Sequence, residues 1–252
     1  MTKTFQEAYK DYQKEIDQFI SQFSNSGEVF GNQPRNTIKL FPLNGKQINI
    51  KSFKVPNLVN QIAYKFFRKS KAQRSFEYAN VLKNRGIGTP EPIAYYESSN
   101  PLLFKHSFYV SEHLDVDLTY RELSHNLNYP DHENILRGFT RFTYRLHQEQ
   151  IHFLDHSPGN TLIKKVGEGY EYFLVDLNRM EFGPMDFDKR MRNFERLTKQ
   201  ESMVKTMSDE YAKCSGEDPK KVFDAMWTYT QEFQEKFQRK KRLKKKLKFW
   251  KK

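Results

Sequence analysis

Asp155, Asn160 and Asp176 have side-chain types and a spacing that could bind a divalent cation and accept a proton. Asp155 and Asn160 lie five residues apart in the segment LDHSPGNTLI, and Asp176 follows in YFLVDLNRM. Mg²⁺ prefers oxygen ligands and usually takes only one or two carboxylates from protein, because phosphate and water supply the rest of its shell. The pattern therefore indicates phosphoryl transfer, in which Asp155 accepts a hydroxyl proton while Asn160 and Asp176 bind the metal.

Short apolar runs surround these three residues. One run covers residues 161–163 and another covers 172–175, and a glycine-containing turn at 166–169 separates them. This arrangement predicts a β-hairpin that presents both metal ligands to one cleft. The alternative is a structural turn, because Ser-Pro-Gly-Asn is common in turns and its polar side chains can cap the backbone.

Length and composition limit the class of protein. A chain of 252 residues can bury a sizeable core as one large domain or as two lobes. It contains no apolar run of membrane-spanning length and no apolar signal-peptide core near its start, so we expect a cytoplasmic protein. The single cysteine, Cys214, excludes an internal disulfide and a multi-cysteine zinc site.

The hydrophobic periodicity predicts a mixed architecture. Strand patterns lie in three segments between residues 28 and 54 and again at 92–97 and 107–114. Helical patterns occupy the N-terminal segment, the segment between the third and fourth strands, and most of the second half. The predicted helices cover residues 6–23, 57–68, 72–85, 131–150, 187–200, 201–213 and 218–250.

These elements predict an α+β fold with a small antiparallel β-sheet lobe and a mainly helical lobe. We expect four parts in the chain: an N-terminal helix, an ATP-binding lobe, a helical catalytic lobe and a basic tail. Their boundaries are residues 1–26, 27–114, 115–235 and 236–252.

At this level of detail the chain resembles the lipopolysaccharide kinase family, whose members phosphorylate Kdo or heptose in the lipopolysaccharide inner core. The resemblance covers residues 27–200, and its second motif particularly resembles members from Bacteroidetes-type bacteria. It implies a two-lobed, protein-kinase-like fold that uses ATP and Mg²⁺. The motifs are INIKSF, RKSKAQRSFEYANVLKNRGIGTPEPIAYYE, SFYVSEHL, IHFLDHSPGNTLI and YFLVDLNRMEF.

The resemblance also implies residue roles. It makes Asp155 the catalytic base and makes Asn160 and Asp176 the magnesium ligands. Glu77 on a small-lobe helix would hold the lysine that contacts the ATP phosphates. We assign this phosphate-contacting role to Lys51 in INIKSF, and Lys54 and Lys65 are the alternatives. Glu112 and Leu114, after the fifth strand, would offer backbone groups to adenine.

Three departures from kinase motifs stand out. The loop at residues 31–35 has one glycine where protein kinases use G-x-G-x-x-G to cover the phosphates. Phe153 replaces the histidine that usually lies two residues before the catalytic Asp, so the support of that loop must come from elsewhere. Asp176 precedes Leu177-Asn178 rather than Phe-Gly, as in sugar-phosphorylating kinases more than in regulated protein kinases.

Nearby polar residues admit structural explanations. His152 and His156 flank the predicted catalytic loop, and we interpret both as hydrogen-bonded structural groups rather than catalytic ones. The basic strip from Arg68 to Arg74 either contacts phosphate or acidic sugar, or forms a solvated helix face.

The tail combines dense positive charge with an apolar stripe. The formal net charge is +12, and residues 236–252 hold eleven Lys or Arg and no acid, which leaves +1 for the remainder. We therefore assign the basicity to the tail. Leu243, Leu247 and Trp250 recur at helical spacing, which favours an anionic inner-membrane surface over nonspecific binding to nucleic acid.

Together these features predict an ATP-dependent sugar kinase, peripheral on the inner membrane, that acts on the lipopolysaccharide core or a lipid A precursor. Two alternatives remain: a phosphotransferase for a small molecule or protein, and an inactive kinase-like membrane scaffold. No specific nucleic-acid partner is expected.

Overall fold

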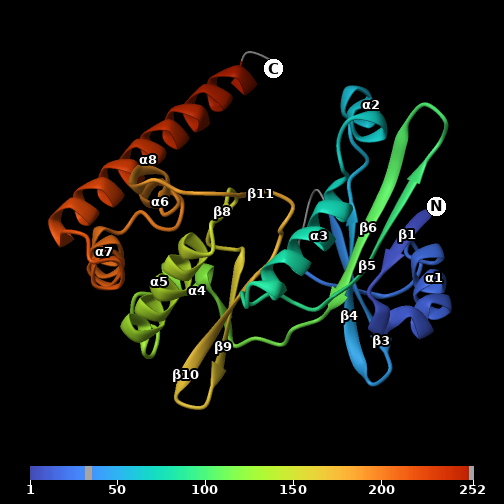
Figure 1. Cartoon of the computed structure of the whole chain (residues 1–252). Coiled ribbons are helices and arrows are strands. Elements are labelled where there is room, and N and C mark those ends of the chain that lie inside the picture. Colours follow the sequence, from blue (N-terminus) through green and yellow to red (C-terminus); the bar gives the residue numbers. More distant parts are fainter. Residues whose placement is uncertain (32–35, 250–252) are drawn as a thin grey trace. The chain divides into compact units, whose positions relative to one another are not determined.

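The computed structural model describes residues 1–31 and 36–249 of the chain, with side chains described up to residue 245. The chain divides into two compact units, each with its own core (Figure 1). The first unit comprises Met1–Asp115 and Leu174–Arg179, and the second comprises Val116–Phe173 and Met180–Lys252. The segment Leu174–Arg179, which carries Asp176, thus belongs with the N-terminal half of the chain.

The first unit is built on a six-stranded sheet in the order β1-β5-β6-β4-β3-β2, with antiparallel neighbours. A two-residue turn joins β3 to β4, and both its residues, Asn44 and Gly45, have the positive φ that a type I′ hairpin turn requires. The strands are β1 (Thr2–Phe5), β2 (Glu28–Val29), β3 (Thr37–Leu43), β4 (Lys46–Phe53), β5 (Pro92–Ser99) and β6 (Phe104–Glu112).

Helices pack around this sheet. The 3₁₀ helix η1 (Glu7–Tyr12) and α1 (Gln13–Ser21) share a core with β3 to β6, in which Ile16 and Ile20 are buried. Helices α2 (Leu58–Phe66) and α3 (Lys71–Asn84) begin at Asn57 and Ser70, whose side chains accept hydrogen bonds from backbone N–H groups of the first turn. Helix α3 packs on β5 and β6.

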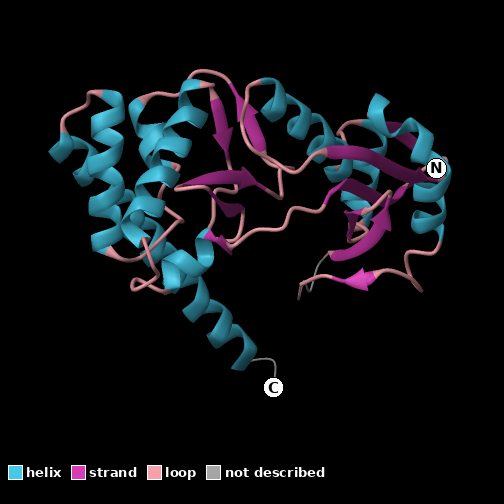
Figure 2. Ribbon diagram, turned by 90° about the horizontal axis from the view of Figure 1, so that it is seen from below, coloured by secondary structure: helices cyan, strands magenta, loops and turns pink. Residues whose placement is uncertain are grey.

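The second unit is mainly helical, and its core lies among α4, α5, α7 and α8. Figure 2 shows its short strands beside these helices, including the hairpin of β9 and β10. The helices are α4 (Tyr120–His125), α5 (His132–Gln148), α6 (Phe187–Arg192), α7 (Glu201–Ser215) and α8 (Pro219–Phe249). The strands are β7 (Leu118–Thr119), β8 (Ile151–Phe153), β9 (Thr161–Val166), β10 (Gly169–Leu174) and β11 (Met180–Phe182).

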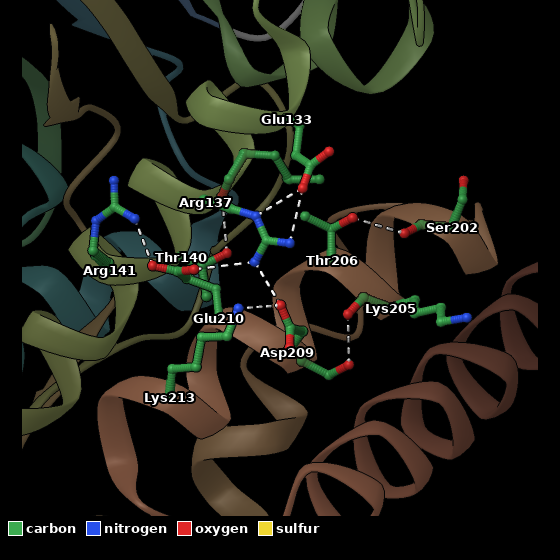
Figure 3. Close-up of polar contacts among 12 residues, drawn as sticks. Glu133, Arg137, Thr140, Arg141, Ser202, Lys205, Thr206, Asp209, Glu210 and Lys213 are labelled. Carbon is green, nitrogen blue, oxygen red and sulfur yellow. Dashed lines mark hydrogen bonds and ion pairs between the residues drawn. The ribbon is translucent and has the colours of Figure 1, made fainter.

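An ion-pair network joins α5 to α7 on one side of this core (Figure 3). Glu210 is 8% exposed and accepts hydrogen bonds from Arg137 at 3.1 Å and from Arg141. Burial opposes ionisation of Glu210, but these two hydrogen bonds hold its pKa below the usual value. Arg137 also bonds Asp209 at 2.6 Å, so one guanidinium serves two carboxylates of α7. The network fixes the two helices side by side.

The expected strands and most expected helices are confirmed; one expected helix needs correction, and some elements were not expected. Residues 2–5, for which no element was expected, form an edge strand paired with β5, so the sheet has a sixth strand. The helix expected over 187–200 ends at Arg192. Helix α4 and strand β7 were not expected, and β7 pairs with β9 through Leu118 and Ile163.

Helix α8 runs beyond the other helices of its unit (Figures 1 and 2). Val222, Met226 and Thr230 are buried near its start, whereas every side chain from Glu235 to Lys245 is exposed. Leu247 and Trp250, which we placed on an apolar stripe, fall where the structure describes no side chains. Within the part of the chain that the structure describes, no helix has both the length and the apolar character needed to span a membrane.

Candidate active site

Lys51 and Asp176 form the ionic centre of the first unit. Lys51 lies buried on β4, and its Nζ atom is 2.7 Å from Oδ1 of Asp176. Asn178 Nδ2 donates to the same Oδ1 atom at 2.7 Å. Because both donors use Oδ1, the hydrogen bonds of the described residues leave Oδ2 of Asp176 for another cation.

Backbone contacts hold the segment that carries Asp176. The backbone N–H of Leu174 donates to the carbonyl of Gly88 at 2.9 Å, and the Thr89 hydroxyl donates to the carbonyl of Leu174 at 2.9 Å. Asp176 itself has a φ of +60°, a left-handed conformation that is strained for a side-chain-bearing residue. Such strain concentrates at functional sites, where surrounding contacts maintain it. Here the contacts aim the carboxylate at Lys51.

Cations gather around this carboxylate. Burial lowers the pKa of Lys71, on the first turn of α3; Asp176 opposes that shift, and the positive charges of Arg74, Lys51 and Arg179 add to it. One carboxylate therefore lies near several positive charges. That balance suits a site for a polyanion such as a triphosphate.

Glu77 is paired differently from our expectation. Its carboxylate accepts two hydrogen bonds from Lys69, at 2.9 and 2.8 Å, and one from Gln73 at 3.0 Å. Lys51 pairs with Asp176 instead, so the expectation of an ion pair between Glu77 and Lys51 is wrong. Of the alternative lysines, Lys65 donates to the Ser99 hydroxyl at 3.0 Å and Lys54 is exposed.

The predicted adenine contacts lie at the end of β6. The Glu112 carboxylate accepts hydrogen bonds from Lys46 at 2.6 Å and from the Tyr9 hydroxyl at 2.7 Å. The backbone N–H of Glu112 donates to Glu91, so that group is occupied within the sheet region. Leu114 follows two residues later and is half-buried. Its contact with adenine stays a prediction.

In the second unit, Asp155 lies in a loop after β8. Its Oδ1 atom is 2.7 Å from Nη1 of Arg196, which also donates to the carbonyl of Leu154 at 3.3 Å. Asn160 Nδ2 donates to the backbone carbonyl of Asp155 at 2.8 Å. Because the amide nitrogen of Asn160 makes this bond, its carbonyl oxygen is the atom left for a metal ion.

A polar chain supports this loop in place of the missing histidine. Asn193 Nδ2 donates to the carbonyl of Phe153 at 2.9 Å, and its Oδ1 lies 3.2 Å from Nε2 of the buried His147. Burial lowers the pKa of His147 to about 3, so the ring is neutral. Nε2 therefore donates to Asn193, and Nδ1 accepts from the Tyr211 hydroxyl at 2.9 Å. Asn193 and His147 thus support the loop at the position where Phe153 replaces the usual histidine.

The two flanking histidines have structural surroundings. His156 is 1% exposed among the rings of Phe139, Phe153 and Phe194, and burial lowers its pKa to about 4. Neither ring nitrogen of His156 makes a hydrogen bond of normal geometry among the described residues, so the expected hydrogen bond is wrong although the surroundings are structural. His152 lies 3.3 Å from Glu181, and its pKa is also lowered by burial. The surroundings of neither histidine indicate a role in proton transfer.

Sequence reasoning missed Asn193 and Arg196. They lie about 40 residues after the loop that they support. No motif at that distance marks them, because the expected helix over 187–200 gave them no special position.

Comparison with known proteins concerns the fold. No protein-family model matches the chain, and no curated protein matches it. A solved structure of WaaP in complex with acyl carrier protein is similar, with a TM-score of 0.63 and 14% sequence identity. The alignment covers 94% of this chain and 99% of the WaaP chain. The expected α+β, kinase-like fold is thereby confirmed, with a β-sheet unit and a helical unit.

Proposed function

We propose that this protein is an ATP- and Mg²⁺-dependent phosphotransferase. The observation that carries the proposal is the ion pair of buried Lys51 with Asp176, whose strained backbone and neighbouring cations suit a metal-bound triphosphate. The fold it shares with WaaP, a lipopolysaccharide kinase, supports the same reading.

Each predicted residue then has a role that fits its contacts. Asp155 accepts the proton of the acceptor hydroxyl, and Arg196 holds that carboxylate in position through its hydrogen bond to Oδ1. Asn160 in the second unit and Asp176 in the first each keep one oxygen that would suit a magnesium ligand, and Mg²⁺ would supply neutralisation of phosphate charge. Lys51 contacts phosphate oxygens, which are better acceptors for its ammonium than water is.

The acceptor that we propose is a sugar, Kdo or heptose, of the lipopolysaccharide inner core at the inner membrane. The motifs that resemble the lipopolysaccharide kinases support this choice, as does the exposed basic extension of α8, which suits an anionic bilayer carrying a lipid-anchored acceptor.

The test is ATP turnover with purified Kdo-lipid A and inner-core acceptors. We expect Asp155→Asn and Asp176→Asn each to lower turnover at least a hundredfold, since each removes a charged group from the reaction. Glu171→Gln, on an exposed position of β10, is the matched control and should keep full activity. Equal turnover in all four proteins would reject the assignment.

Other acceptors and an inactive scaffold give different results. Turnover of ATP with a small molecule or protein, but not with core sugars, would move the substrate while keeping the chemistry. Thermal unfolding with Mg-ATP separates a scaffold that does not bind nucleotide, because binding stabilises the folded state by RT ln(1 + [L]/Kd).

A further inference from the structure

Helix α2 presents an apolar face to solvent. No residue of this helix is buried, and its apolar side chains repeat at steps that place them on one stripe. Phe67, directly after the helix, is 82% exposed. The other members of this apolar face are Leu58, Val59, Ile62 and Phe66, which are between 42% and 75% exposed.

Side chains beside and opposite this stripe anchor α2 to the first unit. The Tyr64 ring contacts the Phe104 ring edge-on at 5.7 Å, and Lys65 Nζ donates to the Ser99 hydroxyl at 3.0 Å. Both partners belong to the β5–β6 hairpin, next to which Figure 1 places α2. Leu102, in the turn of this hairpin, is 71% exposed. The apolar face is therefore held outward by a fixed helix.

The surroundings of this face are strongly basic. From Lys54 to Phe76 the sequence contains six Lys or Arg and no Asp or Glu. Arg68 and Lys69 follow Phe67 directly and are exposed. The residues outside the tail sum to a net charge of only +1, although they include this basic region. The tail is therefore not the one basic part of the chain.

We propose that the apolar face of α2, with Leu102 and the adjoining cations, inserts into the surface of an anionic lipid bilayer. Protruding Val, Ile and Phe side chains flanked by Lys and Arg are the composition of an interfacial helix, whose apolar side enters the headgroup region while its cations meet lipid phosphates. Of the basic strip at residues 68–74, Arg68 thereby gains a partner, whereas Lys69 is paired with Glu77 and Lys71 and Arg74 lie near Asp176. This contact lies in the first unit and is independent of the α8 extension and of phosphate transfer.

A local fluorescent reporter tests the contact directly in the full chain. Cys214→Ser removes the native thiol, Val59→Cys then carries an environment-sensitive NBD label, and Lys220→Cys at the exposed start of α8 carries the control label. With vesicles of phosphatidylethanolamine and phosphatidylglycerol we expect the label at 59 to brighten several-fold and shift to the blue. The label at 220 should change little, and phosphatidylcholine vesicles should have little effect on either label.

A second measurement guards against effects of the label. The triple variant Val59→Ser, Phe66→Ser, Phe67→Ser should bind the anionic vesicles at least about tenfold more weakly, because it removes apolar area that would enter the lipid. Its thermal unfolding midpoint should match that of the parent, since all three side chains are exposed. Asp155→Asn should bind vesicles normally, which separates this proposal from the enzymatic one. An unchanged label at 59 on vesicle-bound protein, or a triple variant that binds within twofold of the parent, would overturn the proposal and favour an acidic protein as the partner of this face.

Discussion

Replacing His156 by Phe tests whether this buried ring is structural. Its two ring nitrogens are buried without a hydrogen-bond partner within the described structure, and three phenyl rings surround it. An unpaired buried polar group costs about 1 to 3 kcal/mol. Phe removes that cost but adds a little volume to a packed core. At pH 7.5 we therefore expect His156→Phe to be at least as stable as the wild type.

The larger effect should appear at low pH. Burial lowers the pKa of folded His156 to about 4, whereas a histidine in an unfolded chain titrates near 6.5. Between these two pKa values the His156 ring is protonated in the unfolded state but not in the folded state. The free energy of unfolding therefore falls as the pH drops below about 6.5. Between pH 7.5 and 5.0 this group removes roughly 2 kcal/mol from the free energy of unfolding. His156→Phe should abolish that loss.

The assay is urea unfolding of the second unit at pH 7.5 and 5.0. The chain has two tryptophans, so Trp250→Phe leaves Trp227 on α8 as the reporter for this unit. The buried His147 remains in both proteins and its contribution cancels in the comparison. His106→Phe, at an exposed position of the first unit, controls for the loss of one histidine.

Two results would refute the reasoning. A pH dependence that is the same in His156→Phe and wild type would mean that the folded ring takes up a proton after all. Complete loss of ATP turnover in a stable His156→Phe protein would show that the ring has a catalytic role.

The remaining predictions concern the candidate site residues of each unit and the tail. Lys51→Met should lower kcat/KM for ATP roughly 10- to 100-fold, which corresponds to the loss of one charged hydrogen bond. Glu77 is bonded to Lys69, so Glu77→Gln should keep kcat/KM within about threefold of the wild type. Equal losses of kcat/KM in the two variants would restore the expected role of Glu77. Arg196→Met should lower kcat by a similar 10- to 100-fold with little change in KM for ATP, and Arg196→Lys should recover part of it, because Arg196 positions Asp155; a change confined to KM would contradict this. Binding to anionic vesicles should weaken with added salt and with Gln at the exposed tail cations, and salt-independent binding in a sedimentation assay would argue against the electrostatic part. Those cations are Arg239, Lys240, Lys241, Arg242, Lys244 and Lys245.

Local sequence signals predicted most of the individual elements. The Asn44-Gly45 turn and the alternation in its flanking strands are local features, so the β3–β4 hairpin could be predicted. The same holds for α2 and α3, whose capping residues lie next to the helices they cap. Strand β1 could not be predicted, since it forms by pairing with β5, some 90 residues away. The end of α6 was missed for a similar reason, because Asn193 at that end bonds the distant Phe153.

The sequence by itself determined which side chains can do chemistry: carboxylates and an amide at the spacing of a phosphotransferase, a set of candidate lysines and a basic tail. Only the tertiary structure decided which of these groups meet. It pairs Lys51 with Asp176 across 125 positions, gives Glu77 to Lys69, and brings Arg196 to Asp155. The physical reason is that charge and hydrogen-bonding capacity belong to a residue, whereas the few ångströms over which an ion pair acts depend on how distant elements pack.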